Sequence, residues 1–292
     1  MNSKKGPNIK GLLQAGARLL GPLPFPAPVP MGSKQLMTEG KEHSVDIYAP
    51  TSTSGPLSGM GILIVHGGGF IVGSRNMKPV LILVKALTAA GASVASTDYT
   101  LVPKGGTLAQ ATWEVRDTLR WWRTKLNSDF GKDTFVAAMG LSAGVSPLFR
   151  ASCTFPEVRP DALIGIYGAL KFRPEVSPLI SMVYRKLLGT SNREEWRTHS
   201  ASHIMEHTPY PLPVQLIHGK QDTVCPYEDS EELHHWRESQ GLPSELHIHD
   251  EETHAFLNQV KGSATQKTLQ QMTNFLEKTR TASRSNSCNL SS

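Results

Sequence analysis

The chain has 292 residues, of which 39% are hydrophobic and 19% are charged, and its formal net charge is +5. This composition supplies enough apolar side chains for a buried core and lacks the charge excess that is typical of disordered chains. The basic residues are scattered, many of them beside acidic ones, so no basic stripe indicates nucleic-acid binding. The length fits one large domain.

The cysteine content argues against a disulfide framework and against a zinc site. The three cysteines, Cys153, Cys225 and Cys288, are far apart and form no C-x-x-C pair. Reduced thiols in an intracellular compartment are the simplest interpretation, so we expect a cytoplasmic protein. No run of about 18 apolar residues occurs, so an ordinary membrane-spanning helix is not predicted.

Residues 1–30 are predicted to form an N-terminal flap. Three lysines precede two leucine pairs, as in a signal peptide, but Gln14 and Arg18 interrupt the apolar segment. An amphipathic helix over residues 8–20 therefore fits better. Such a helix also leaves open a peripheral contact with a membrane surface. Five prolines between Gly21 and Pro30 predict an extended, stiff connector to the next segment.

Short β-branched runs alternate with helical patterns along the rest of the chain. Strands are predicted at residues 45–48 (an edge strand), 61–66, 92–97, 134–140, 163–167, 214–218 and 246–249. Helices are predicted at residues 77–90, 108–126, 142–153, 228–240 and 264–279. This alternation predicts an α/β fold, in which a mostly parallel sheet has helices on both faces and reactive loops at the carboxyl ends of its strands.

The domain is expected to span residues 31–280, with a small helical cap inserted at about residues 169–212. The insertion contains helical patterns around residues 179–188 and 193–206 and no strong strand, so we expect it to lie over the active edge of the sheet. Residues 281–292 are mostly Ser, Asn, Thr and Arg without apolar periodicity, which predicts a disordered tail.

A glycine-rich segment follows the second predicted strand. It reads His66-Gly67-Gly68-Gly69-Phe70. Successive glycines let the backbone approach a ligand closely and direct N–H groups at a developing negative charge. Such a segment supplies an oxyanion hole together with the amide that follows the nucleophile, so the predicted donors are Gly67, Gly68 and Ala143. A phosphate-binding loop is the alternative, but neither of its glycine signatures follows.

The nucleophile is predicted at Ser142. The sequence Gly140-Leu141-Ser142-Ala143-Gly144 lies between a predicted strand and a predicted helix. This is the context of the G-x-S-x-G nucleophile elbow, where a tight turn exposes the serine Oγ and leaves no room for side chains at the glycines. A glycine-rich turn that serves only the fold is the alternative interpretation.

The partners of the serine are expected in the chain order acid, then histidine. Asp222 lies on the loop after the strand at 214–218, where it could orient an imidazole, although Asp is also a common turn residue. His254 lies on the polar loop after the last strand and is the predicted general base. His247 and His249 compete for this role, but they lie on the strand and precede the loop.

These motifs resemble those of the hormone-sensitive-lipase-like branch of α/β-hydrolase esterases. The similarity covers roughly residues 40–280 and includes His66–Phe70, Asp98–Pro103, Gly140–Gly144, Asp222 and His254-Ala255-Phe256. The resemblance implies hydrolysis of carboxylic esters without a metal or organic cofactor, and a lid built partly from residues 1–30. The chain departs from the family pattern at Leu141, Val145, Thr100 and Lys104, which affects substrate range rather than the triad.

The sequence therefore predicts a serine carboxylic-ester hydrolase that forms an acyl-enzyme on short- to medium-chain esters, with a small-molecule ester as its partner. An amide or peptide hydrolase remains open because the same groups serve acyl transfer generally. A non-catalytic small-molecule receptor on the same fold is the alternative from another class. His203 and His207 have the spacing of zinc ligands, but Glu does not follow His203, so no metal is predicted.

Overall fold

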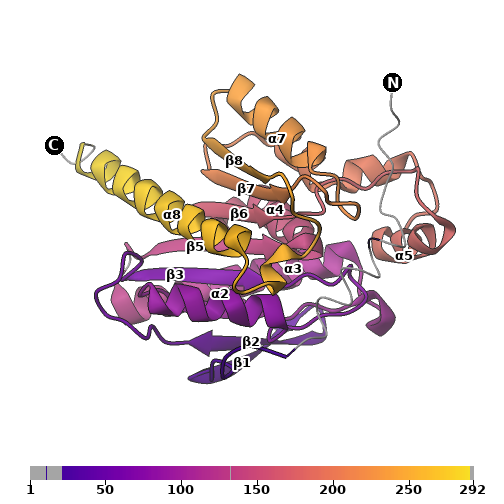
Figure 1. Cartoon of the computed structure of the whole chain (residues 1–292). Coiled ribbons are helices and arrows are strands. Elements are labelled where there is room, and N and C mark those ends of the chain that lie inside the picture. Colours follow the sequence, from indigo (N-terminus) through magenta and orange to yellow (C-terminus); the bar gives the residue numbers. More distant parts are fainter. Residues whose placement is uncertain (1–10, 12–21, 132, 290–292) are drawn as a thin grey trace.

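The computed structural model describes residue 11, residues 22–131 and residues 133–289 (Figure 1). Its centre is an eight-stranded sheet with the order β1-β2-β4-β3-β5-β6-β7-β8. The strands are β1 Gly32–Thr38, β2 Lys41–Tyr48, β3 Met60–Val65, β4 Ser93–Thr97, β5 Phe135–Leu141, β6 Ala162–Ile166, β7 Val214–Gly219 and β8 Ser244–His249. β2 pairs antiparallel with β1 and β4, and the other neighbours pair in parallel.

Helices cover both faces of this sheet. The helices of the described residues are α2 Lys78–Ala89, α3 Leu108–Phe130, α4 Val145–Thr154, α5 Pro178–Leu188, α6 Ala201–His207, α7 Glu228–Ser239 and α8 Ser263–Asn289. The side chains of β3 alternate between two cores, with Leu63 packing into the cluster beneath α3 and α4 and Ile64 into the cluster beneath α2 and α8. Figure 1 shows α2 and α8 on the near face of the sheet. The predicted α/β architecture is confirmed.

The edge of the sheet differs from the prediction. Residues 45–48 were predicted as an edge strand, but β2 lies between β1 and β4 and the outer strand is β1. The first four residues of β1 are exposed, so its sequence, GSKQLMT, shows no apolar alternation that would predict a strand. β1 forms because its backbone pairs with β2 over seven residues, from Gly32 opposite Ile47 to Thr38 opposite Lys41.

The chain termini also differ from the sequence prediction or lie outside the described residues. The prediction of a disordered tail is wrong for residues 281–289, because α8 continues to Asn289. No glycine or proline interrupts this segment, and the hydroxyl of Thr281 donates to the carbonyl of Glu277 one turn earlier. The amphipathic helix predicted at residues 8–20 lies outside the described residues, apart from Gly11.

The proline-rich connector lies along α2. Leu23 packs against the core cluster beneath this helix, and the ammonium of Lys85 lies 4.0 Å from the ring centroid of Phe25. Among residues 22–131 and 133–289, no helix is long and apolar enough to cross a membrane.

The insertion between β6 and β7 contains α5, a short 3-10 helix at Glu195–His199 and α6, close to the predicted helices. A chain of aromatic contacts ties it to the sheet. Phe172 lies 6.2 Å from Phe70 and 5.0 Å from Tyr184 between ring centroids, and Tyr184 lies 5.4 Å from Trp196. These contacts hold α5 beside the loop that follows β3.

Candidate active site

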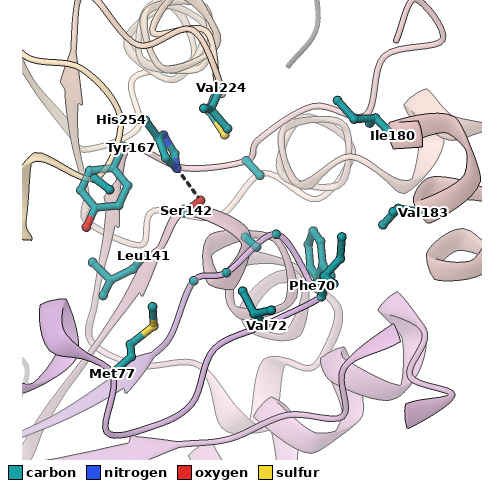
Figure 2. Close-up of a pocket in the computed structure, with 18 of the residues that line it drawn as sticks. Phe70, Val72, Met77, Leu141, Ser142, Tyr167, Ile180, Val183, Val224 and His254 are labelled. Carbon is teal, nitrogen blue, oxygen red and sulfur yellow. Dashed lines mark hydrogen bonds between the residues drawn. The ribbon is translucent and has the colours of Figure 1, made fainter. Parts of the chain in front are cut away.

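The predicted site residues meet at the carboxyl edge of the parallel strands. Ser142 directly follows β5, Gly67 and Gly68 follow β3, Asp222 follows β7 and His254 follows β8. Parallel strands end at the same edge, so residues far apart in the sequence converge there. Figure 2 shows the side chains of Ser142 and His254 side by side in one pocket, joined by a hydrogen bond.

The turn at Ser142 requires the glycines on either side of it. Ser142 has a φ of 50°, in the left-handed region that non-glycine residues rarely adopt. A Cβ on Gly140 would lie 2.7 Å from the Cα of Val145, and one on Gly144 would lie 2.3 Å from the carbonyl oxygen of His66. The glycines therefore permit the tight turn that directs the Ser142 side chain into the pocket.

Ser142, His254 and Asp222 form a hydrogen-bonded series, here named the relay. The Oγ of Ser142 lies 2.8 Å from the Nε2 of His254, and the Nδ1 of His254 lies 2.7 Å from the Oδ2 of Asp222. Because an ionised carboxylate only accepts, Nδ1 carries the proton and Nε2 is the acceptor for the serine hydroxyl. This is the tautomer that a general base needs.

The carboxylate of Asp222 is held by donors on both oxygens. Oδ1 accepts from the backbone N–H of Val224 at 2.8 Å and of Cys225 at 2.9 Å. Oδ2 accepts from His254 and, at 3.1 Å, from the Nε2 of His218. Burial would raise the pKa of Asp222, but the two histidines hold that pKa well below its usual range. The acid of the relay is therefore ionised.

The glycine loop after β3 lies directly against Ser142. A Cβ on Gly67 would lie 3.0 Å from the Cβ of Ser142, and Gly68 has a φ of 115°. Gly67, Gly68 and Ala143 all line the pocket that contains Ser142. His66 supports the loop, because its Nδ1 donates to the carbonyl of Gly67 at 2.6 Å. The sequence motif alone predicts no separate role for this histidine.

The pocket has a volume of about 350 Å³ and an apolar wall. The wall is formed by Phe70, Ile71 and Val72 after β3, Met77 and Pro79 at α2, Leu179, Ile180, Val183 and Tyr184 of α5, and Val224. None of the described residues that line the pocket is Lys, Arg, Asp or Glu. Figure 2 shows labelled wall residues on both sides of Ser142. The cavity therefore suits neutral, apolar groups on either side of the reacting bond.

Two further residues near the relay were not predicted to act there. Tyr167, the residue after β6, presents its ring edge-on to His254 with the centroids 5.1 Å apart. The thiol of Cys225 lines the pocket, and burial raises its pKa well above the ordinary value, so it is a poor nucleophile.

The two histidines that competed with His254 for the role of general base contact other residues. His247 pairs with Glu245 at 3.8 Å and His249 with the hydroxyl of Thr268 at 2.8 Å.

Metal-ligating side chains do not form a cluster in the described part of the chain. No group of three or more His, Cys, Asp or Glu residues there could hold a metal ion. The rings of His203 and His207 lie 3.9 Å apart on α6, and Nδ1 of His207 bonds to the carbonyl of His203.

Two family models match the sequence. The model of the dienelactone hydrolase family matches residues 111–280, more than half of the chain, and the model named BD-FAE matches residues 45–146. A non-reducing polyketide synthase, ausA, from Aspergillus calidoustus is 32% identical over 167 residues. That match covers 50% of this chain, which spans only 6% of the synthase.

Several esterases are among the solved structures that share this fold. An esterase from Pyrobaculum calidifontis matches with a TM-score of 0.70 and 16% identity, covering 92% of this chain and 90% of its own. A bacterial heroin esterase matches with a TM-score of 0.73 and 18% identity, covering 91% and 89%. Esterase Est2 from Thermogutta terrifontis has a TM-score of 0.66 and 22% identity, covering 84% and 92%. At these identities the likeness establishes the α/β-hydrolase fold.

Proposed function

This chain belongs to the dienelactone hydrolase family, and we propose that it is a serine hydrolase that cleaves carboxylic esters through an acyl-enzyme. The observation that carries the proposal is the relay, with Ser142 Oγ 2.8 Å from His254 Nε2 and His254 Nδ1 2.7 Å from Asp222. These distances lie within the range that proton transfer from a nucleophile to a general base requires.

In the first half of the reaction, His254 takes the proton of Ser142 while Oγ attacks the ester carbonyl carbon. The carbonyl oxygen becomes an oxyanion, which accepts hydrogen bonds from the backbone N–H groups of Gly67, Gly68 and Ala143. Asp222 orients the imidazole and stabilises its protonated form. His254 then gives the proton to the leaving alkoxide, so the alcohol departs and the acyl group stays on Ser142.

In the second half, water replaces the alcohol. His254 accepts a proton from the water, whose oxygen attacks the acyl carbon, and the same oxyanion donors stabilise the second tetrahedral intermediate. The proton returns to Ser142 Oγ as the carboxylic acid leaves. Every proton therefore passes through His254, and no metal or organic cofactor takes part in this scheme.

The substrate class follows from the pocket. We propose neutral esters of short to medium chain length, because the cavity of about 350 Å³ has apolar walls and its described lining contains no cation to pair with an anionic acyl group. The match to a polyketide synthase favours a second candidate, a polyketide-derived ester. An amide or peptide substrate and a non-catalytic receptor remain as rivals, although the paired His254 argues against the receptor.

The test is hydrolysis of p-nitrophenyl esters from C2 to C12 by the wild type and by Ser142→Ala, together with labelling by a serine-directed organophosphonate. Ser142-dependent turnover supports the esterase and ranks its chain length. Labelling without turnover points to an amide or a selective substrate, for which anilides and polyketide-derived esters are the next probes. A Ser142→Ala protein that folds and keeps full activity would overturn the proposal.

We also propose peripheral membrane contact through residues 1–30, whose sequence combines lysines with leucine pairs. Flotation of the full chain and of a chain lacking residues 1–30 with anionic liposomes tests this contact. Recovery of the full chain with the liposomes and of the shortened chain in the soluble fraction supports it, whereas equal recovery of both ends it. A cytoplasmic location is proposed separately and is checked by fractionation of cells.

A further inference from the structure

A second histidine shares the acid of the relay. His218, near the end of β7, has its Nε2 3.1 Å from the same Oδ2 of Asp222 that His254 contacts at 2.7 Å. The side chains of His218 and Asp222 are both fully buried. The mechanism described above makes no use of His218, although it contacts the acid directly.

The neighbours of His218 determine where its proton lies. Nε2 also lies 2.9 Å from the carbonyl oxygen of Cys225, so both of its partners are acceptors and Nε2 must carry the hydrogen. Nδ1 lies 2.8 Å from the hydroxyl of Ser230 on α7, which can donate to it. This pattern satisfies both ring nitrogens of a neutral imidazole, and a buried neutral ring avoids the cost of desolvating a charge.

The arrangement has two opposing effects on Asp222. Four donors, from Val224, Cys225, His254 and His218, fix the carboxylate so that Oδ2 stays directed at His254. The N–H of His218 also draws on the negative charge of Oδ2, which leaves less of that charge to stabilise protonated His254. The first effect favours turnover, and the second makes His254 a weaker base.

We propose that His218 is a positioning residue that holds the Asp222 carboxylate in register with His254 and moderates the basicity of that histidine. The inference rests on the proposed function for its kinetic readout. Two other titratable groups lie next to the relay: Tyr167, whose ring edge contacts His254, and the thiol of Cys225. The charges of Asp229 and its partner Arg173 act on that thiol. The variants below leave all of these groups unchanged.

The decisive variant is His218→Phe combined with Ser230→Ala. Phenylalanine retains a buried ring without the N–H, and alanine avoids leaving the Ser230 hydroxyl without its partner. His218→Gln is the conservative variant, because its amide N–H can reach the position of Nε2. His249→Phe is the matched control. His249 is another buried histidine, on β8 next to β7, and its ring bonds to the hydroxyl of Thr268.

The first readout is the pH dependence of kcat/KM for a p-nitrophenyl ester. For the double variant we expect the acid limb to move up by about half a pH unit and the plateau kcat to fall roughly 5-fold, as for the loss of one charge-assisted hydrogen bond. His218→Gln should restore both, and His249→Phe should move neither. An acid limb that stays in place or moves to lower pH in the double variant overturns the proposal.

The second readout does not require turnover. The Nδ1 proton of His254 can be followed by NMR, with Asp222→Asn used to assign its signal, and its titration gives the basicity of the ring directly. We expect the midpoint to rise in the double variant by the same half unit, about 3-fold in proton affinity. A wild type without Ser142-dependent hydrolysis would end the proposed function, while an unchanged NMR midpoint would end the role of His218.

Discussion

The relay and the wall of the pocket face the same cavity but are built in opposite ways. The carboxylate of Asp222 accepts hydrogen bonds from four donors, and the turn at Ser142 depends on glycines that leave no room for a Cβ. Several wall residues are partly open to solvent, with Leu179 50% and Val72 56% exposed. Proton transfer depends on atomic positions, whereas an apolar wall needs only shape and volume.

This difference predicts that substitutions in the relay lower the rate of chemistry, whereas substitutions in the wall change which ester is preferred.

Loss of the proposed acid, Asp222, should have the largest effect. Asp222→Asn keeps the shape of the side chain but lets His254 adopt the wrong tautomer, so we expect kcat to fall by about 10⁴-fold. Asp250→Asn, on an exposed residue near the same loop, is the control and should retain wild-type activity. Steady-state kinetics on a p-nitrophenyl ester measures both, and a loss below about 10-fold in Asp222→Asn would contradict the assignment of the acid.

Disturbing the proposed oxyanion donors should have the next largest effect. A Cβ at Gly67 would lie 2.9 Å from the carbonyl of Leu141 and 3.0 Å from Ser142, so Gly67→Ala must displace this loop. We expect kcat to fall roughly 100- to 1,000-fold, as for the loss of one donor. Gly69→Ala meets no atom within 4 Å and carries only the modest backbone strain of a φ of 62°, so it should cost far less. Equal losses in the two variants would mean that the loop acts through strain alone.

Substitutions in the wall of the pocket should change KM rather than kcat. Val183 lines the pocket, while its neighbour Met182 is 52% exposed and is not among the lining residues. Val183→Phe should raise KM for the longer esters roughly 10-fold and leave acetate hydrolysis almost unchanged, because it removes volume from the acyl site. Met182→Phe adds the same ring outside the pocket and should change neither. An equal loss on short and long esters would contradict a role in chain-length selection.

Loss of the Asp222 carboxylate should have a smaller effect on the stability of the fold at low pH. The folded state holds the pKa of Asp222 below its unfolded value, so this carboxylate stabilises the fold above about pH 4, and that contribution is lost as the pH falls toward the folded-state pKa. The free energy of unfolding in urea, measured at pH 6 and pH 3, should therefore drop less in Asp222→Asn than in the wild type. Identical drops would show that Asp222 is not a source of acid sensitivity.

Much of the fold could be predicted from local patterns, and the exceptions have physical causes. The buried strands are apolar runs bounded by turns, so β3 and β5 differ from the predicted ranges by one residue at each end. β1 was not predicted because it is an exposed outer strand. Backbone pairing with β2 holds it in place, and such pairing requires no apolar pattern in the sequence. The end of α8 was not predicted to be helical because it is polar and has no apolar stripe.

The site divides in the same way. Local sequence determined the turn at Ser142 and the glycine loop at Gly67 and Gly68, because steric limits on the backbone act between neighbouring residues and so appear as motifs. Only the tertiary structure decided that His218 shares the carboxylate of Asp222 with His254, and that α5 completes an apolar pocket. Those contacts depend on how the strand ends converge and on which helix packs over them, which short-range patterns do not encode.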